Sequence, residues 1–257
     1  MSEAMPREGR RRGPWAVVAG SAGGVGREIA LRLAEDGYAV VVCGRDSAGV
    51  EETRKLIEWT GGLALDMVAD LGDCAAVRRL ATATVALLDG TPVEVLVNNA
   101  GEAEYGPSED KFDAVFNPNV KAPLILTDAF APLMAARGRG TIVNVAGLDA
   151  SAGVGDQGLM QAARAALIRL TKMWMAEYGP KGVRVNTVDL GRPPTPADAR
   201  RQQPPPGYPG GAPASHGGPG AVAEAIRFLV ATRAASIVTM TAAAGGAESF
   251  GCPSAPG

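Results

Sequence analysis

The chain has 257 residues, of which 46% are apolar and 20% charged, and its formal net charge at pH 7 is −2. This apolar content can fill one sizeable core, so we expect a single domain. The near-neutral net charge argues against an electrostatic interface with nucleic acid or anionic lipid. A small molecule is therefore the expected partner.

The cysteines and the longest apolar runs indicate the compartment. Cys43, Cys74 and Cys252 are an odd number without metal-ligand spacing, and no secretory leader precedes them, so we expect a cytoplasmic protein with neither disulfides nor a metal site. The apolar runs are of strand length and too short to cross a bilayer. The basic run REGRRR at 7–12 could be a targeting or nucleic-acid patch, but we interpret residues 1–13 as a solvated, disordered tail.

From Trp15 onwards, short β-branched runs alternate with longer helical stretches. WAVVAG is followed by GREIALRLAEDG, then by YAVVVCG and by a charged helix over 51–58. In the first helical stretch, Val25, Ile29 and Leu33 recur at four-residue spacing. This spacing predicts one apolar stripe that packs against a sheet.

The same alternation continues towards the end of the chain. Further strands are predicted at 63–67, 93–97, 141–146, 183–188 and 236–241. Helices are predicted around Val77, Leu126, Leu167 and Ala225. Strands that alternate with helices are typical of βαβ units. We therefore expect an α/β fold over residues 14–250, a single domain built on a doubly wound, seven-stranded parallel sheet.

The stretch 191–220 interrupts this alternation of strands and helices. It is crowded with proline and glycine, as in RPPTPADARRQQPPPGYPGG, and it is interpreted as a long loop. Long insertions in compact domains are either functional lids or disordered segments, and both interpretations stay open here.

A glycine-rich turn, VAGSAGGVGRE, follows the first strand. Gly20, Gly24 and Gly26 are spaced for a sharp turn into a helix whose free N–H groups would face a pyrophosphate. Glycines of this kind also occur simply to let a strand and a helix pack closely.

Several further motifs stand in a fixed order with this turn. They are Asp70 after the third strand, NNAG at 98–101, Asn119 and GVRVNTV at 182–188. Together with the Gly20–Gly24 spacing, they resemble the short-chain dehydrogenase/reductase family from about Trp15 to Gly246. The resemblance implies a Rossmann-type sheet, and it implies a homodimer or homotetramer that associates through the helices around Leu126 and Leu167.

The resemblance also implies how a dinucleotide would be held. The phosphates would lie on Gly20, Ser21, Gly24, Val25 and Gly26, the adenine at Asp70, the ribose beside Asn98, Ala100 and Gly101, and the nicotinamide amide at Thr195. Where an acidic residue would hold an unmodified ribose, this chain has Gly44 followed by Arg45. We therefore expect NADP(H), although a lone arginine after a strand can also be a solvated loop residue.

The catalytic positions of the family are largely replaced. GTIVNVAG and RAALIRLTKMWMAE fix the register, in which Asn119 is retained, Gly147 replaces the serine, Met160 the tyrosine and Arg164 the lysine. A thioether has no proton to give. An arginine can still donate to ribose hydroxyls. A positioned acid commonly raises the rate ~100- to 10,000-fold. Carbonyl reduction by the family route should therefore be severely slowed.

Met160 also has a purely structural interpretation. It shares one helical stripe with other apolar side chains, namely Ala163, Leu167, Leu170 and Trp174. It could therefore be a core residue without a chemical task. Equally, it could make the cleft apolar and shape-complementary to a substrate.

Other residues in segments that border the family's cleft could replace the acid. They are Tyr105, Asp149, Ser151, Asp156, Gln157 and His216. Tyr105 could instead be a packing aromatic, Asp156 a helix cap and His216 a solvated loop residue. None of them forms a paired constellation in the sequence.

Three functions stay open. The first is a repurposed enzyme of specialised metabolism that performs non-redox cyclisation, dehydration or isomerisation of a small apolar substrate, with or without bound NADP(H). Its cleft would use Asn119, Tyr105, Asp149 or Asp156. The second is an NADPH-dependent ketoreductase with another proton donor. The third is a non-catalytic NADP(H)-binding partner subunit.

Overall fold

Seven parallel strands form one sheet in a computed structural model that describes residues 13–88, 90–99, 111–147, 154–190, 219–231 and 239–241. For 154–157 and 239–241 only the backbone is described. The predicted tail up to residue 12, and 191–218 of the predicted lid, lie outside these ranges.

The strand order is β3-β2-β1-β4-β5-β6-β7, and every neighbouring pair is parallel. The strands are β1 (Trp15–Ala19), β2 (Ala39–Gly44), β3 (Ala64–Val68), β4 (Val93–Asn98), β5 (Gly140–Ala146), β6 (Val183–Asp189) and β7 (Thr239–Thr241). The predicted doubly wound α/β fold is confirmed. Strands β1 and β2 are buried along their whole length, as expected for β-branched runs covered on both faces.

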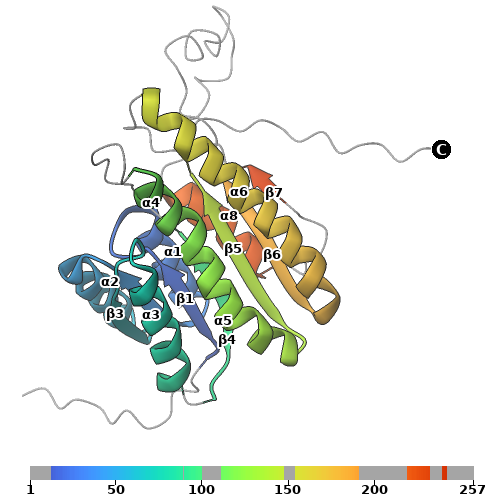
Figure 1. The fold of residues 1–257 in the computed structure, drawn as a ribbon. Helices are drawn as coiled ribbons and strands as arrows, with labels where there is room; N and C mark the ends of the chain where they lie inside the picture. The colour runs from blue at the N-terminus through green and yellow to red at the C-terminus, as the bar shows by residue number, and fades with distance from the viewer. Residues whose placement is uncertain are drawn as a thin grey trace, which may run out of the picture.

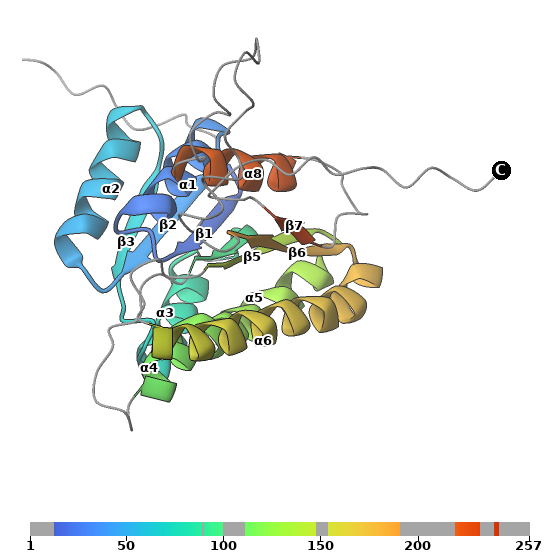
Figure 2. The same cartoon turned by 90° about the horizontal axis from the view of Figure 1, so that it is seen from above.

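Helices cover both faces of the sheet (Figures 1 and 2). One layer contains α1 (Gly24–Glu35), α2 (Ser47–Trp59) and α8 (Pro219–Ala231). The other contains α3 (Cys74–Leu87), α4 (Lys111–Phe116), α5 (Ala122–Ala136) and α6 (Val154–Tyr178), with the 3-10 turn η2 (Gly179–Lys181) after it. Each layer has its own apolar core against the sheet. No helix within the described ranges is both long and apolar enough to span a bilayer.

Two details differ from the sequence prediction. Helix α8 begins at Pro219, so the last two residues assigned to the lid are helical. Helix α4 continues into a π-helix, η1 (Asn117–Lys121), before α5, and neither was predicted. The π-helix was not predicted because the stretch contains Pro118, which lacks an N–H and therefore indicates a break in a regular helix. Here it lies near the start of a widened turn instead.

The sheet order reverses between β1 and β4, which is where this class of fold binds ligands. The segments that leave the carboxyl ends of β1, β4, β5 and β6 begin with Gly20, Asn99, Gly147 and Leu190. They therefore share one edge of the sheet, and the candidate site lies there.

Candidate functional site at the carboxyl edge of the sheet

The glycine turn brings three elements together at this edge. Gly20 has a positive φ of 75°, and a Cβ on it would lie 1.9 Å from the carbonyl oxygen of Asn99. A Cβ on Gly26 would lie 1.9 Å from the carbonyl oxygen of Gly20. Only glycine fits at either position, so the turn lets α1 approach β1 and β4 closely.

The start of α1 provides unpaired donors. Its N-cap, Gly23, offers no side-chain hydrogen bond, and its first turn contains no acidic residue. A Cβ on Gly23 or Gly24 would meet no atom within 4 Å, so the space beside the turn is open. The first amides of a helix have no partner within it. The amides of Gly24, Val25 and Gly26 therefore suit a pyrophosphate.

Ser21, which was predicted to join this cradle, is turned the other way. Its side chain is buried, its Oγ donates to the carbonyl oxygen of Val18 at 2.7 Å, and it accepts from the N–H of Cys43 at 3.0 Å. The backbone N–H of Ser21 donates to the carbonyl oxygen of Cys43 at 2.9 Å. The residue ties β1 to β2 and has no donor left for a phosphate.

Arg45 and Asp70 follow the neighbouring strands β2 and β3, and both side chains are exposed. Asp70 Oδ1 accepts from the N–H of Gly72 at 2.8 Å, which shapes the turn into α3. A Cβ on Gly44 would come within 3.1 Å of the Cβ of Ala22, so a larger side chain would be crowded there. Arg45 is thus the charged residue next to the end of β2, as NADP(H) recognition would require.

The asparagines of the NNAG motif play two different roles. Asn98 is buried, and its Nδ2 donates to Oδ1 of Asn144 on β5 at 2.7 Å. Nδ2 of Asn99 donates to the carbonyl oxygen of Gly20 at 3.0 Å. Asn98 therefore joins two central strands, while Asn99 holds the glycine turn. Ala100 and Gly101 lie outside the described residues.

Asn119 lies in the π-helix η1 and is directed back along the chain. Its Nδ2 donates to the carbonyl oxygen of Val115 at 2.8 Å. One of its two side-chain donors is therefore used within η1 and α4.

Met160 packs into a small apolar cluster. Its side chain is 4% exposed and lies with Val115 and Ala163, and Phe116 and Leu159 pack against this cluster. This burial agrees with the interpretation of Met160 as a packing residue, and it leaves the apolar-cleft interpretation open. Farther along the same stripe, Leu167 and Trp174 are buried as well.

Arg164, one turn after Met160, forms an ion pair that was not predicted. Its Nη2 donates to Oδ2 of Asp189, the last residue of β6. The side chain of Asp189 is 9% exposed and that of Arg164 is 26% exposed. A charged residue at the end of an apolar strand indicates a loop, so only the three-dimensional arrangement identifies Asp189 as a site residue.

Gly147 follows β5 beside this ion pair, because Ala146 and Asp189 are aligned in neighbouring strands. A Cβ on Gly147 would lie 3.2 Å from Cδ1 of Leu190. A serine at this position would therefore require Leu190 to move.

The family model described as short chain dehydrogenase matches residues 14–205. The chain belongs to the short-chain dehydrogenase family. A curated relative, (2S)-[(R)-hydroxy(phenyl)methyl]succinyl-CoA dehydrogenase subunit BbsD of Thauera aromatica, is 35% identical over 180 residues, covering 68% of this chain and 71% of that protein.

Solved structures agree with this assignment. A metagenomic short-chain oxidoreductase in complex with NADP has a TM-score of 0.71 and 28% identity, covering 90% of this chain and 96% of that one. A variant of actinorhodin polyketide ketoreductase with NADPH has a TM-score of 0.71 and 27% identity, with the same coverage. The fold is therefore one on which related oxidoreductases bind NADP or NADPH.

The short-chain dehydrogenase family uses a tyrosine at the position of Met160, and neither of the two tyrosines among the described residues lies at this edge. Tyr38 directly precedes β2 and Tyr178 ends α6, so both lie at the amino edge of the sheet. Burial raises the pKa of each of these phenols. Neither can donate a proton at the candidate site.

The remaining predicted residues are not placed. Tyr105, Asp149, Ser151, Thr195 and His216 lie outside the described residues. Asp156 and Gln157 belong to α6 by their backbone. Since α6 begins at Val154, Asp156 is its third residue, and its side chain lies outside the description, so its predicted role as a helix cap stays a prediction.

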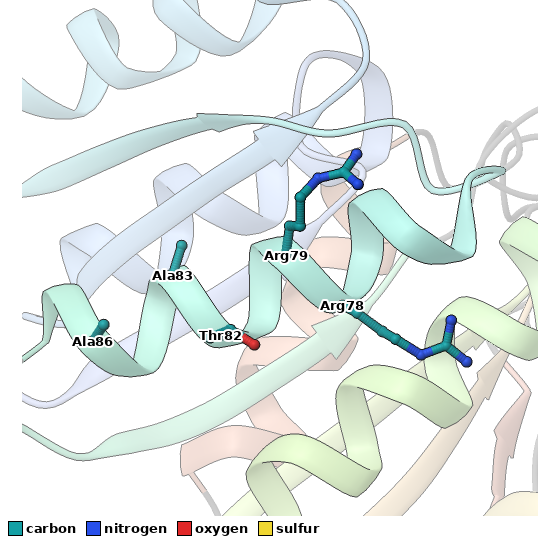
Figure 3. A pocket seen from close by; sticks show the side chains of 5 residues that line it. All are labelled: Arg78, Arg79, Thr82, Ala83 and Ala86. Carbon is teal, nitrogen blue, oxygen red and sulfur yellow. The ribbon is translucent and has the colours of Figure 1, made fainter.

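A surface hollow on α3 does not contribute to this site. It is lined by Arg78, Arg79, Thr82, Ala83 and Ala86, all from one helix (Figure 3). The two arginines diverge from each other in Figure 3, so they do not converge on one anion.

Proposed function

We propose that this short-chain dehydrogenase binds NADP(H) and uses its cleft for a non-redox reaction, namely cyclisation, dehydration or isomerisation of a small apolar substrate in specialised metabolism. The observation that carries the proposal is Met160, which is packed among apolar side chains at the position of the family's proton donor.

Binding of NADP(H) is supported by the donors of this edge. The uncapped start of α1 suits the pyrophosphate, and Arg45 suits a 2′-phosphate. Both related structures cited above contain this cofactor. When bound, NADPH supplies a hydride in the family's reactions.

The non-redox character is supported by the residues that occupy the family's catalytic positions. Gly147 and Met160 have no hydroxyl, and Arg164 is engaged by Asp189. Loss of one oxyanion donor costs ~3 kcal/mol, and loss of a positioned acid a further ~100-fold or more. Without these groups a carbonyl substrate would be bound but poorly reduced.

A second candidate is an NADPH-dependent reductase with another acid. It is favoured by the relatives, which are called dehydrogenase and ketoreductase. Tyr105, which follows NNAG, would be the first residue to test as donor. A third candidate, a non-catalytic cofactor-binding subunit, would bind NADP(H) without converting any substrate.

The first experiment identifies the cofactor and its use. The purified protein is denatured, the released nucleotides are identified by mass spectrometry, and NADPH consumption is then followed with a panel of ketones. The proposal expects NADP(H) to be released and NADPH to remain unconsumed. Brisk consumption would favour the reductase instead.

The second experiment restores the family's catalytic groups. The structure indicates that Gly147→Ser, Met160→Tyr and Arg164→Lys are insufficient, because Asp189 would pair with the new ammonium. The set therefore includes Asp189→Asn, and Leu190→Ala makes room for the serine. If the variant with all five substitutions reduces ketones and the parent protein does not, this would support an oxidoreductase site that has lost its catalytic groups.

A further inference from the structure

The ion pair between Arg164 and Asp189 connects α6 to the end of β6. Nη2 of Arg164 donates to Oδ2 of Asp189, and both side chains are largely removed from solvent. Nε of Arg164 is buried and has no acceptor among the described residues. The guanidinium is thus directed towards the carboxyl edge by the carboxylate of Asp189.

The position of this pair along the edge follows from the strand order. The glycine turn above β1 would hold the pyrophosphate, with Arg45 and Asp70 on the β2 and β3 side for the adenosine half. The other half of the dinucleotide must then extend over β4, β5 and β6. Asp189 ends β6, so the pair lies on the nicotinamide half.

The net charge of this half depends on both partners. A guanidinium is charged at any accessible pH. The nicotinamide ring carries one positive charge when oxidised and none when reduced. An arginine without a counter-charge would therefore disfavour the oxidised ring, whereas removal of the arginine would add a negative contribution that favours it.

We propose that Asp189 is a positioning residue that holds Arg164 in place and cancels its charge, so that the nicotinamide half does not discriminate electrostatically between oxidised and reduced cofactor. This inference rests on the proposed binding of NADP(H). By thermodynamic linkage, a site without this preference leaves the reduction potential of the bound cofactor at its value in solution.

The test compares dissociation constants for NADP⁺ and NADPH by calorimetry in the wild type, Asp189→Asn, Arg164→Gln and the double variant. Attraction to the phosphates is common to both cofactors and cancels in their ratio. The ratio of the NADP⁺ to the NADPH constant should rise about tenfold in Asp189→Asn, fall in Arg164→Gln and return to the wild-type value in the double variant.

A purely structural role gives a different pattern, because both single variants would then weaken binding without moving the ratio in opposite directions. Circular dichroism checks the fold first, and either single variant suffices if the other does not fold. The matched control is Asp36→Asn, which breaks the Arg227–Asp36 pair at the other end of α1. It should leave the ratio unchanged.

The outcomes separate the two proposals. If the wild type binds both cofactors but the ratio of the two constants does not change in the variants, only the proposed role of Asp189 is overturned. Steady NADPH consumption overturns the non-redox function but not the charge argument. Failure to bind either cofactor overturns both.

Discussion

The thiol of Cys43 lies fully buried beside the glycine turn and donates to the carbonyl oxygen of Val18 at 3.5 Å. Burial raises its pKa from 9.0 to about 12. The thiol therefore stays protonated at neutral pH and is a packing group rather than a nucleophile.

This shift predicts a stability loss in alkali. The folded pKa is raised, so the contribution of Cys43 is present below pH 9 and is lost as the pH rises towards 12. The free energy of unfolding should fall by up to about 1.4 kcal/mol per pH unit above pH ~9. Urea titrations between about pH 8 and 10 would measure this loss.

Two cysteine variants check the assignment. Cys43→Ala should flatten the alkaline decline, whereas Cys74→Ala, which changes the other described cysteine, should retain it. Equal slopes in the two variants would contradict the prediction.

Single residues at the site were predictable only where the backbone demands them. Gly20 and Gly26 have the spacing expected where a tight turn lets a strand and a helix pack closely, and the structure places both against backbone oxygens. The inward direction of Ser21 and the pairing of Arg164 with Asp189 were not predictable. Both depend on contacts between segments more than twenty residues apart.

Helix α6 is linked to the central strands by a buried polar chain. Nδ2 of Asn98 donates to Asn144, Nδ2 of Asn144 donates to Oγ1 of Thr171 at 2.8 Å, and that hydroxyl donates to the carbonyl oxygen of Leu167 at 2.9 Å. The chain fixes α6 against β4 and β5, and with it the helix that carries Met160 and Arg164.

Replacing Thr171 by valine should weaken this connection. The change keeps the shape but leaves Nδ2 of Asn144 buried without its acceptor, which costs about 1–3 kcal/mol in unfolding free energy. Thr171→Ser keeps the hydroxyl and should cost less. If urea unfolding finds the valine variant at least as stable as the serine variant, the polar chain is not stabilising.

At the scale of elements, the sequence predicted what hydrophobic periodicity can encode. The strands and the helices around Val77, Leu126, Leu167 and Ala225 all occur in the structure. Helix α4 and its π-helical continuation were missed, because NPNVK contains a proline and no apolar stripe. The π-helix is stabilised by local geometry, including the Asn119 contact with Val115, which periodicity does not report.

The whole molecule divides its core between two layers, and this division was predictable from the alternation of strands and helices. The surface is harder to predict. Leu126 and Leu167, which mark the two helices predicted to form the subunit interface, are themselves buried within the chain. Among the described residues of these two helices, the exposed large apolar side chains are Leu133 on α5 and Met173 on α6.

We expect these two side chains to lie in a homodimer or homotetramer interface, by analogy with the family. Leu133→Asp combined with Met173→Asp should lower the mass measured by light scattering after size-exclusion chromatography, because a charge in an apolar interface is strongly unfavourable. Leu87→Asp, at the end of α3, is the control, since Leu87 is 62% exposed elsewhere on the surface. An unchanged mass in the double variant would exclude this interface.

The crossover between β1 and β4 also matters while the chain is being made. β2 can pair with β1 soon after both leave the ribosome, but the other edge of β1 receives its partner only when Val93–Asn98 has emerged. During that interval a fully apolar strand has one open edge, which other nascent chains can join. Slow synthesis of the segment between β2 and β4 should therefore increase the dependence of this protein on chaperones.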